Sequence, residues 1–384
     1  MKRITVLGSG MVGSVIATDL ASDPGHLVTI VDASKVNLAA AAQRAARLGV
    51  RLATVEADCS SAAEIKRVIG DADMVAGALA SRLAFAALKT IIEAGKHFAD
   101  IAFMGEDALE LDGLAKAKGV TAVVDCGVAP GMSHILAARG AAELDVCEAV
   151  EMYVGGLPVE RRWPFEYKAG FSPADVLEEY TRPARLVEGH AVVTRPALSE
   201  PELMEFAGVG TLEAFNTDGL RSMARTYLGK IPHMKEKTLR YPGHIELMRV
   251  FRETGLMDES PVTVGGVSVR PRDLLAKLMF PMWTYQPGEA DLTVMRVIAA
   301  GLRGGKPAKV QYDVHDRYDS VTGTTSMART TAFPCAIMAR RVMNGQFTRR
   351  GVITPEFIGE SGAETEHLLA EQSRRGVLYH KSVV

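Results

Sequence analysis

The first 130 residues alternate short apolar runs with stretches that have the period of an amphipathic helix. The apolar runs are RITVLG (3–8), LVTIVD (27–32), VRLATVEAD (50–58), DMVAGAL (73–79), HFADIAF (97–103) and VTAVVDCG (120–127). Between them lie helical stretches such as MVGSVIATDLAS and LAFAALKTIIEAG, and several of these end in glycine. Strands that alternate with helices predict an α/β fold with a doubly wound parallel sheet of the Rossmann type.

The pattern changes after residue 135. Fewer strand–helix repeats follow, and the strand-like runs are EAVEMYVGGL (148–157), PVTVGGVSV (261–269), DLTVMRVIAAGL (291–302) and AKVQYDVHD (308–316). Polar loops separate these runs, which predicts a second, α+β domain with a mostly antiparallel sheet. The tail is apolar and helical again in TTAFPCAIMARRVMNG. We therefore expect domains at 1–135 and 136–325, with a C-terminal helical return over 326–384 that completes the first domain.

Length and composition agree with two domains and exclude some partners. A chain of 384 residues is too long to fold around a single hydrophobic core. The formal net charge of −2 is far from the basic balance that nucleic-acid phosphates demand, so we expect no nucleic-acid partner. The four cysteines lie far apart without a CxxC pair, which indicates neither a metal site nor a disulfide framework. No signal-peptide pattern and no long apolar run occur, so we expect a cytoplasmic protein that does not cross a membrane.

The first strand runs into a glycine-rich turn, GSGMVG, with Gly8, Gly10 and Gly13 at the spacing GxGxxG. In such a turn the first glycine allows the tight bend, the second lets the backbone approach a pyrophosphate, and the third lets helix and strand pack closely. The helix N-terminus also attracts the anion. The sequence therefore predicts a dinucleotide site, to which the backbone of Met11 and Val12 contributes.

Asp32 closes the second strand at the position where the dinucleotide fingerprint has an acidic residue. A carboxylate accepts hydrogen bonds from a free ribose 2′-hydroxyl and repels a 2′-phosphate, so the sequence favours NAD over NADP, although Lys35 lies close enough in sequence to accept a phosphate. Asp58 ends the third strand, where it either lies near the adenine or only precedes a helix. We expect the remaining cofactor contacts at the carboxyl edge of the sheet, from Ala78, Leu79, Ala80, Asp125 and Gly127.

Blocks of sequence over nearly the whole chain resemble the saccharopine dehydrogenase-like family. In order, they are VLGSGMVG, DCGVAPGM, YVGGLPV, LEAFNTDG, LRYPGH, VRPRDLL and SMARTTAFPCAIMA. The resemblance implies a dinucleotide-binding domain joined to a domain that binds substrate and forms homo-oligomers. It is strongest to members that use NAD to oxidise the ε-amine of L-lysine, which gives allysine and ammonia. Allysine then cyclises to piperideine-6-carboxylate.

The sequence of one loop distinguishes lysine-oxidising members of the family from saccharopine reductases. Saccharopine reductases carry an acidic residue in a loop written GLDPG, and this chain has Ala129 at the matching position in GVAPG. The loop therefore lacks the acid that would meet a secondary amine. Cys126 in the same loop is expected to pack beside the cofactor, and His134 to be structural.

Oxidation of an amine needs a neutral nitrogen, so the site must lower the amine pKa or offer a base. His244 and Glu213 are the candidate catalytic groups, with Glu166 as a further candidate; each could instead cap backbone or form an ion pair. An arginine fork suits the substrate carboxylate, and Arg240 and Arg329 lie in the matching blocks, unless they form structural ion pairs. Thr217 and Asp218 could receive the α-ammonium, and Tyr241 could shape the wall.

Three functions stay open at this point. The first is the oxidation of lysine or a related small amine with NAD. The second is a dehydrogenase for a secondary amine, such as saccharopine or carboxynorspermidine, which would favour NADPH and a more cationic pocket. The third is a protein that binds NAD without catalysis.

Overall fold

The computed structural model describes all 384 residues, and the chain divides into two compact units. The first unit contains Met1–Ala142 and Ala328–Tyr379, and the second contains Glu143–Met327 and His380–Val384. The boundary expected at residue 135 falls inside a helix that continues to Ala142. The last five residues also differ from the expected helical return, because they belong to the second unit.

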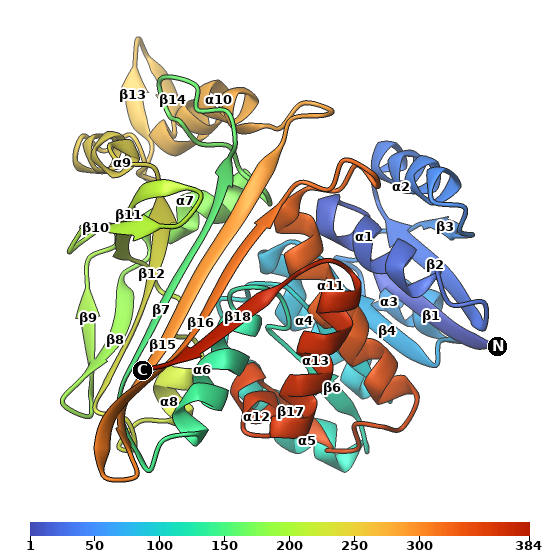
Figure 1. The fold of residues 1–384 in the computed structure, drawn as a ribbon. Helices are drawn as coiled ribbons and strands as arrows, with labels where there is room; N and C mark the ends of the chain where they lie inside the picture. The colour runs from blue at the N-terminus through green and yellow to red at the C-terminus, as the bar shows by residue number, and fades with distance from the viewer. The chain divides into compact units, whose positions relative to one another are not determined.

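The first unit is built on a seven-stranded sheet in the order β17-β6-β5-β4-β1-β2-β3, and every pair in it is parallel. The strands are β1 (Lys2–Leu7), β2 (His26–Asp32), β3 (Ala53–Glu56), β4 (Met74–Gly77), β5 (Phe98–Asp100), β6 (Thr121–Val123) and β17 (Gly351–Ile353) (Figure 1). The predicted doubly wound parallel sheet is confirmed. Strand order reverses between β1 and β4, which is where ligands of such sheets bind, at the carboxyl ends of the strands.

Helices follow these strands and bury apolar side chains against the sheet. They are α1 (Met11–Leu20), α2 (Lys35–Arg47), α3 (Ala62–Ile69), α4 (Ser81–Glu93), the short 3₁₀ helix η1 (Ala108–Leu111), α5 (Asp112–Ala117) and α6 (Met132–Ala142), which is buried along most of its length. Ser34 and Ser61 begin α2 and α3, and each side-chain oxygen accepts a hydrogen bond from the backbone N–H three residues on. Leu7, Val31, Val75 and Phe98 pack with α3 and α4 in one core.

The C-terminal part of the first unit returns as α11 (Ser326–Met343), β17, α12 (Pro355–Gly359) and α13 (Gly362–Arg374). The first two residues of α11 fall to the second unit. The sequence predicted the helical return but not that GVI (351–353) would add a strand. β17 pairs with β6 through Gly351 and Thr121, so the return extends the sheet by one strand.

The second unit contains a nine-stranded mixed sheet. Its main path runs β10-β11-β12-β7-β15-β16-β18, with β8 and β9 attached beside β12. The strands are β7 (Val146–Pro158), β8 (Ala184–Glu188), β9 (Ala191–Arg195), β10 (Glu202–Phe206), β11 (Gly210–Asn216), β12 (His233–Arg240), β15 (Asp291–Arg303), β16 (Lys306–Arg317) and β18 (Tyr379–Val383). β12 and β7 pair in parallel, whereas β10–β11, β11–β12, β12–β8, β7–β15, β15–β16 and β8–β9 pair in antiparallel fashion, so the predicted, mostly antiparallel character is confirmed.

The helices of the second unit are α7 (Pro173–Thr181), α8 (Met223–Thr226), α9 (His244–Glu253) and α10 (Pro271–Trp283). The run at 261–269, expected as a single strand, is instead a two-stranded hairpin of β13 (Val262–Val264) and β14 (Val267–Val269) beside α10 (Figure 1). Gly265 and Gly266 both have positive φ, at 57° and 82°, which is the backbone of a type I′ hairpin turn. This glycine pair divides the apolar run in two.

No helix combines the length and the apolar character that a bilayer crossing requires. All four cysteines are free thiols; Cys59, Cys126 and Cys335 are buried, and Cys147 is half-buried.

An ion-pair network fastens the returning helices to the start of the first unit. Arg340 of α11 donates from Nη1 to Asp19 (2.5 Å) and from Nε to Asp23 (2.6 Å). Arg375, just after α13, donates from Nε to the other oxygen of Asp19 at 2.7 Å. The Asp19 side chain is 11% exposed, so this network is shielded from solvent far better than a surface pair.

We expect Arg340→Ala to lower the free energy of unfolding by about 2 kcal/mol, because two charge-assisted hydrogen bonds to half-buried carboxylates are lost. Urea denaturation measures the change. Arg374→Ala is the matched control, because that side chain is 73% exposed and should change stability by less than about 0.5 kcal/mol. Equal stability of the two variants would contradict the role given to the network.

Candidate functional site

The turn between β1 and α1 brings two backbones so close that only glycine fits. Gly8 has φ +94°, and a Cβ there would lie 2.3 Å from the carbonyl oxygen of Ala78. A Cβ on Gly13 would lie 2.0 Å from the carbonyl oxygen of Gly8. The first glycine therefore packs the turn against the loop after β4, and the third packs α1 against the turn.

Gly10 has a different role because nothing lies within 4 Å of the place where its Cβ would be. It begins α1, and no side chain caps that helix end. The first backbone N–H groups of α1, including those of Met11 and Val12, therefore face an open space with no competing protein acceptor at the cap. A helix N-terminus of this kind binds a phosphate through N–H groups and the helix dipole. The residues present fit the pyrophosphate of a dinucleotide.

Asp32 is tied into the same turn. Its Oδ2 accepts from the backbone N–H of Ser9 (2.7 Å) and the hydroxyl of Ser9 (2.9 Å), and its Oδ1 accepts from the N–H of Ser34 (2.8 Å). A carboxylate has about four acceptor positions, so room for a ribose hydroxyl remains. Lys35, the nearest cation along the chain, lies 3.4 Å from Glu56 and is thus partly neutralised.

The other expected cofactor contacts lie on the loops that follow the strands. Ala78, Leu79 and Ala80 connect β4 to α4, and the N–H of Ala78 donates to Leu7 at 2.8 Å. Asp58 is exposed and accepts from the N–H of Ser60 at 2.9 Å, which lowers its pKa. That geometry favours the reading of Asp58 as a residue that organises the approach to α3.

The loop of Asp125, Cys126 and Gly127 folds back on itself after β6. The N–H of Gly127 donates to Pro130, and a Cβ on Gly131 would lie 2.0 Å from the carbonyl oxygen of Gly127. Cys126 is fully buried, and burial raises the pKa of its thiol far above the usual range. A thiol in that state packs and does not ionise at neutral pH, as expected for Cys126.

Asp100, at the end of β5, was not singled out in the sequence. It is 1% exposed, its Oδ2 has no hydrogen-bond partner, and burial raises the pKa of the carboxyl to about 7, with Asp125 adding to the effect. Its Oδ1 lies where a Cβ on Gly77 would be, at 2.3 Å, so the side chain is packed against β4. Only the position of Asp100 at the carboxyl end of a strand could have indicated it.

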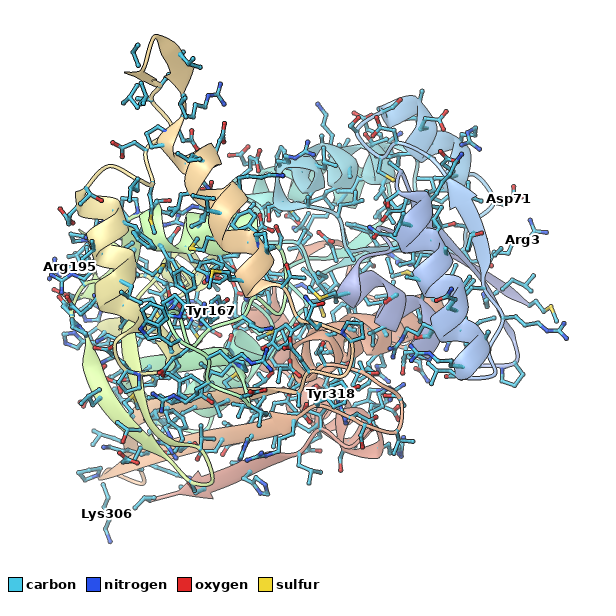
Figure 2. The ribbon with its side chains drawn as sticks, turned by 90° about the horizontal axis from the view of Figure 1, so that it is seen from above. Arg3, Asp71, Tyr167, Arg195, Lys306 and Tyr318 are labelled. Atoms are coloured by element: carbon cyan, nitrogen blue, oxygen red, sulfur yellow. The ribbon has the colours of Figure 1, made fainter.

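In the second unit, Arg240 at the end of β12 is the centre of a buried aromatic cluster. Its Nε donates to the hydroxyl of Tyr180 at 2.9 Å, and its Nη2 lies 3.3 Å from Glu179. The guanidinium also lies 4.4 Å from the ring centre of Tyr167. Figure 2 shows Tyr167 inside this unit, whereas Arg195 and Lys306 stand at its outside. Because Arg240 is 3% exposed and its donors have partners, the geometry favours the structural ion pair over a free carboxylate receptor.

His244, the first residue of α9, lies in the same cluster. Its Nε2 is 3.0 Å from the hydroxyl of Tyr180 and its Nδ1 is 2.9 Å from the carbonyl oxygen of Phe165. The residue is 2% exposed, and burial followed by the charge of Arg240 lowers the pKa of the imidazole to about 3. A ring with both nitrogens engaged and no proton affinity at neutral pH is suited to packing, which favours the backbone-capping alternative for His244.

The remaining predicted residues of the second unit also have partners. Glu213 on β11 is half-buried, and its Oε2 accepts from the N–H of Gly243 at 3.1 Å. Glu166 forms an ion pair with Arg161. The hydroxyl of Tyr241 donates to Pro158 at 2.9 Å, and Arg161 lies over the Tyr241 ring.

Asp218 and Thr217 belong to one buried loop but have different partners. Arg185 binds both oxygens of Asp218 at 2.8 Å each, so this carboxylate already has its cation. The hydroxyl of Thr217 donates to Glu236 at 2.7 Å. The sequence had not indicated Glu236.

Arg329 lies in α11 and belongs to the first unit, whereas Arg240 belongs to the second. The Nη2 of Arg329 donates to the carbonyl oxygen of Arg375 at 2.5 Å, and Arg329 is 7% exposed.

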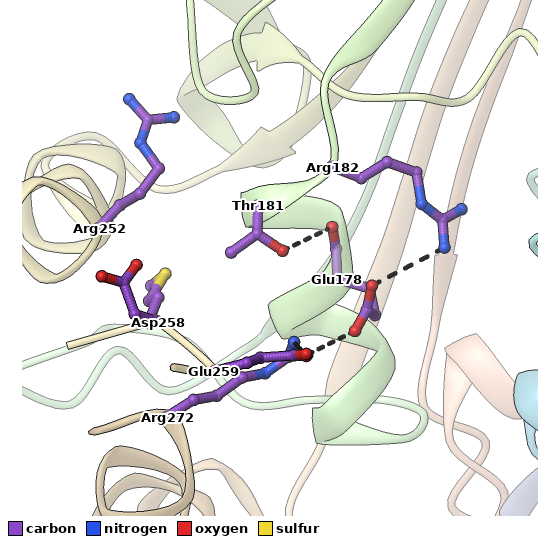
Figure 3. Close-up of a pocket in the computed structure, with 8 residues that line it drawn as sticks. Glu178, Thr181, Arg182, Arg252, Asp258, Glu259 and Arg272 are labelled. Carbon is purple, nitrogen blue, oxygen red and sulfur yellow. Dashed lines mark hydrogen bonds and ion pairs between the residues drawn. The ribbon is translucent and has the colours of Figure 1, made fainter. Parts of the chain in front are cut away.

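A cavity of about 420 Å³ opens beside α7 in the second unit (Figure 3). It is lined by Glu178, Thr181, Arg182, Arg252, Met257, Asp258, Glu259 and Arg272. Arg272 is held by Glu178 (2.6 Å) and Glu259 (2.5 Å), and Arg252 points away from the other charged side chains in this view. The cavity thus offers no converging set of cations. No cluster of three or more His, Cys, Asp or Glu side chains could hold a metal ion.

The strand period of β12 shows which polar residues share a face, and the structure shows that this face is buried. Met234, Glu236, Thr238 and Arg240 occupy alternate positions, so they share one face of the sheet, and all four are buried. Charged residues at successive positions of a buried face are uncommon and mark either an ion-pair network or a ligand site.

Comparison with known proteins assigns both parts of the chain to one family. Residues 4–123 match the saccharopine dehydrogenase NADP binding domain, and residues 127–377 match the saccharopine dehydrogenase C-terminal domain. The solved structure of the L-Glu-forming saccharopine dehydrogenase of Saccharomyces cerevisiae superposes with a TM-score of 0.82 over 100% of both chains at 18% identity. That likeness shows the fold.

Two relatives show how far the similarity extends. The mitochondrial alpha-aminoadipic semialdehyde synthase of Bos taurus is 23% identical over 98% of this chain, and the chain covers 47% of that protein. The NADP(+)-dependent, L-glutamate-forming saccharopine dehydrogenase of Schizosaccharomyces pombe is 20% identical over 83% of this chain and 86% of its own length. The chain thus spans about half the length of the bovine relative. Since the two family matches together cover almost every residue from 4 to 377, the chain belongs to the saccharopine dehydrogenase family.

Proposed function

We propose that this protein is an NAD-dependent dehydrogenase that oxidises the ε-amine of L-lysine to allysine with release of ammonia. The observation that carries the proposal is Ala129, half-buried in the loop after β6, where relatives that act on a secondary amine are expected to have an acid. A methyl group at that position neither protonates nor orients a secondary amine. A primary amine still needs a base, which another part of the site can supply.

The nucleotide half of the proposal is supported by the turn at Gly8–Gly13 and by Asp32. When bound, NAD accepts the hydride that leaves the carbon next to nitrogen. The chain supplies the open N-terminus of α1 for the pyrophosphate and the Asp32 carboxylate for the ribose. The Asp32 carboxylate would repel a 2′-phosphate, and the nearest cation along the chain, Lys35, forms an exposed ion pair with Glu56.

The substrate half requires a base and a cation. Of the two candidate bases, Glu213 is half-buried and bonds only the N–H of Gly243, so one of its oxygens remains for an amine or a water. We propose Glu213 as the base and assign His244 to packing. Arg240 is committed to Glu179 and two tyrosines, so we assign it to packing as well.

A secondary-amine dehydrogenase is the second candidate, and a specific observation favours it. The family match covers an NADP binding domain by name, and relatives are named as NADP(+)-dependent saccharopine dehydrogenases. A third candidate binds the nucleotide without turning over an amine.

We further propose that the protein forms a homo-oligomer through the second unit. Leu274, Leu278 and Met282 of α10 are four residues apart, so they form one stripe, and they are 50%, 66% and 48% exposed. The hairpin beside this helix exposes Val262, Val264 and Val267. A two-stranded hairpin with exposed valines is marginally stable alone, and a second copy related by a two-fold axis would cover it with the same surface. We place the protein in the cytoplasm because its four cysteines are free.

A substrate screen tests the reaction. With NAD, the purified protein should form NADH with L-lysine but not with saccharopine, and the rate should rise with pH because only the neutral ε-amine, with a pKa of about 10.4 in water, loses hydride. Absorbance of the reduced cofactor follows the reaction. Turnover of saccharopine with NADP would favour the second candidate, and cofactor binding without turnover of any amine the third.

The cofactor preference depends on Asp32. Because the exposed Ala33 follows it directly, the double variant Asp32→Ser with Ala33→Arg removes a repelling carboxylate and adds a cation. The ratio of kcat/KM for NADP to that for NAD should rise by about 10-fold or more. Ala33→Arg alone is the control and should move the ratio much less. An unchanged ratio in the double variant would remove Asp32 from the ribose site.

The oligomer surface predicts that Leu278→Glu shifts the protein to smaller species, because a charge cannot be buried unpaired at an apolar interface. Size-exclusion chromatography with light scattering measures the mass. Lys277→Glu, on the neighbouring exposed position, should leave the mass unchanged. If both variants keep the wild-type mass, the stripe on α10 is not the interface.

A further inference from the structure

Glu236 is a buried carboxylate without a cation. It lies on β12 and is 6% exposed. Its Oε2 accepts from the hydroxyl of Thr217 at 2.7 Å, and the Thr217 hydroxyl is also 2.8 Å from that of Thr238. Its other oxygen, Oε1, has no hydrogen bond, and no arginine or lysine forms an ion pair with the residue.

The loop after β11 packs directly on this carboxylate. A Cβ on Gly219 would lie 2.1 Å from Oε2 of Glu236, so only the bare backbone of a glycine leaves room for the carboxylate. The close packing keeps Glu236 against this loop, on the same face of the sheet as Thr238. One of its oxygens nevertheless has no hydrogen-bond partner in the protein.

The charges that surround Glu236 do not balance. The groups that act on it come from three elements: Glu179 on α7, Asp218 after β11 and Arg240 on β12. Arg185 takes both oxygens of Asp218, and Arg240 is held by Glu179 and Tyr180. Both guanidinium groups are thus engaged by another carboxylate, and neither forms an ion pair with Glu236.

A buried carboxylate in this condition either takes a proton or binds a cation. Burial, together with the charges of Glu179 and Asp218, raises the pKa of Glu236 to about 8. The carboxyl is therefore mostly protonated at neutral pH until a cation enters. A primary ammonium group has three N–H donors, which match Oε1 of Glu236 and the hydroxyl oxygens of Thr217 and Thr238.

We propose that Glu236, with Thr217 and Thr238, binds the non-reacting ammonium group of an amino-acid substrate, which is the α-ammonium of L-lysine. This proposal rests on the proposed function. A carboxylate stabilises a charged amine, whereas loss of hydride needs a neutral one, so the group held at Glu236 is not the reacting ε-amine. Asp218, the earlier candidate for this role, is occupied by Arg185.

Binding of L-lysine and of 6-aminohexanoic acid, which lacks the α-amine, tests the site without turnover. Isothermal titration at pH 7 in two buffers of different ionisation enthalpy gives the affinity and the protons released. The wild type should prefer L-lysine and release about one proton as Glu236 ionises. Glu236→Gln, which keeps an oxygen for Thr217, should weaken L-lysine about 10-fold or more, change 6-aminohexanoic acid little, and abolish the proton release.

Two further variants keep the test decisive. Glu205→Gln, on exposed β10, is the matched control and should bind L-lysine like the wild type. Glu236→Asp retains the charge and should restore part of the preference if Glu236→Gln folds poorly. Unchanged preference and proton release in Glu236→Gln would overturn the proposal, as would proton release on adding potassium chloride alone, because the site would then hold a metal cation.

The proposed function and this site fail in different ways. If the protein binds L-lysine through Glu236 but oxidises no amine, the site stands and the dehydrogenase assignment does not. If it oxidises L-lysine and Glu236→Gln keeps wild-type affinity, only the site is wrong.

The stability of the ligand-free protein gives an independent readout of the charge. Because folding raises the pKa of Glu236 from 4.5 to about 8, the folded state favours the protonated form, and wild-type stability should fall as the pH rises through that window. Glu236→Gln cannot ionise, so its Tm relative to the wild type should increase from pH 5 to pH 8.5. A difference in Tm that does not depend on pH would mean that the carboxyl carries no buried charge.

Discussion

The first unit depends on the contact between the turn after β1 and the backbone that faces it. Side chains are excluded at Gly8 and Gly13 by carbonyl oxygens 2.3 and 2.0 Å from where a Cβ would be. This contact sets the start of α1 over the carboxyl edge of the sheet, at the point where strand order reverses. The same turn supplies Ser9, whose N–H and hydroxyl hold Asp32 in place. One steric constraint therefore positions both the open N-terminus of α1 and the Asp32 carboxylate, to which we assign the pyrophosphate and the ribose in our proposal.

The second unit follows a different constraint, which is the compensation of buried charge. Arg240 stabilises two tyrosines and Glu179 in an aromatic core that also contains His244 and Trp283. Taking these charges out of water is costly, and only dense hydrogen bonding offsets it. The arrangement explains why residues with catalytic side chains serve the structure here. Glu236 differs from the other buried acids of this region because no arginine or lysine forms an ion pair with it.

Much of the fold could be predicted from the sequence because it depends on local periodicity. Six of the seven strands and the glycine turn of the first unit followed from apolar runs and residue spacing. In the second unit the long runs predicted β7, β15 and β16, but not the shorter strands that pair beside them. The hairpin at 261–269 was missed since its two glycines lie inside one apolar run. β17 was missed because three residues are too short for a period, and only its pairing with β6 makes it a strand.

The candidate site was less predictable since its chemistry depends on which side chains meet. Nothing in LRYPGH reveals that Tyr180 lies between Arg240 and His244. Similarly, FNTDG contains Thr217 and Asp218 but not the partners Glu236 and Arg185, which are distant along the chain. Polar residues also occupy both faces of β12, so the strand period does not reveal that Glu236 and Arg240 are buried.

The origin of the transferred hydride tests the central claim most directly. L-lysine carrying deuterium at C6, incubated with NAD and the wild-type protein, should yield deuterated NADH and piperideine-6-carboxylate that has lost one deuterium, both read by mass spectrometry. Deuterium that stays on the amino acid while NADH forms without label would mean oxidation at another carbon, and absence of NADH would exclude lysine as the substrate. Either result would contradict the assignment of this protein as a dehydrogenase that uses NAD to oxidise the lysine side-chain amine.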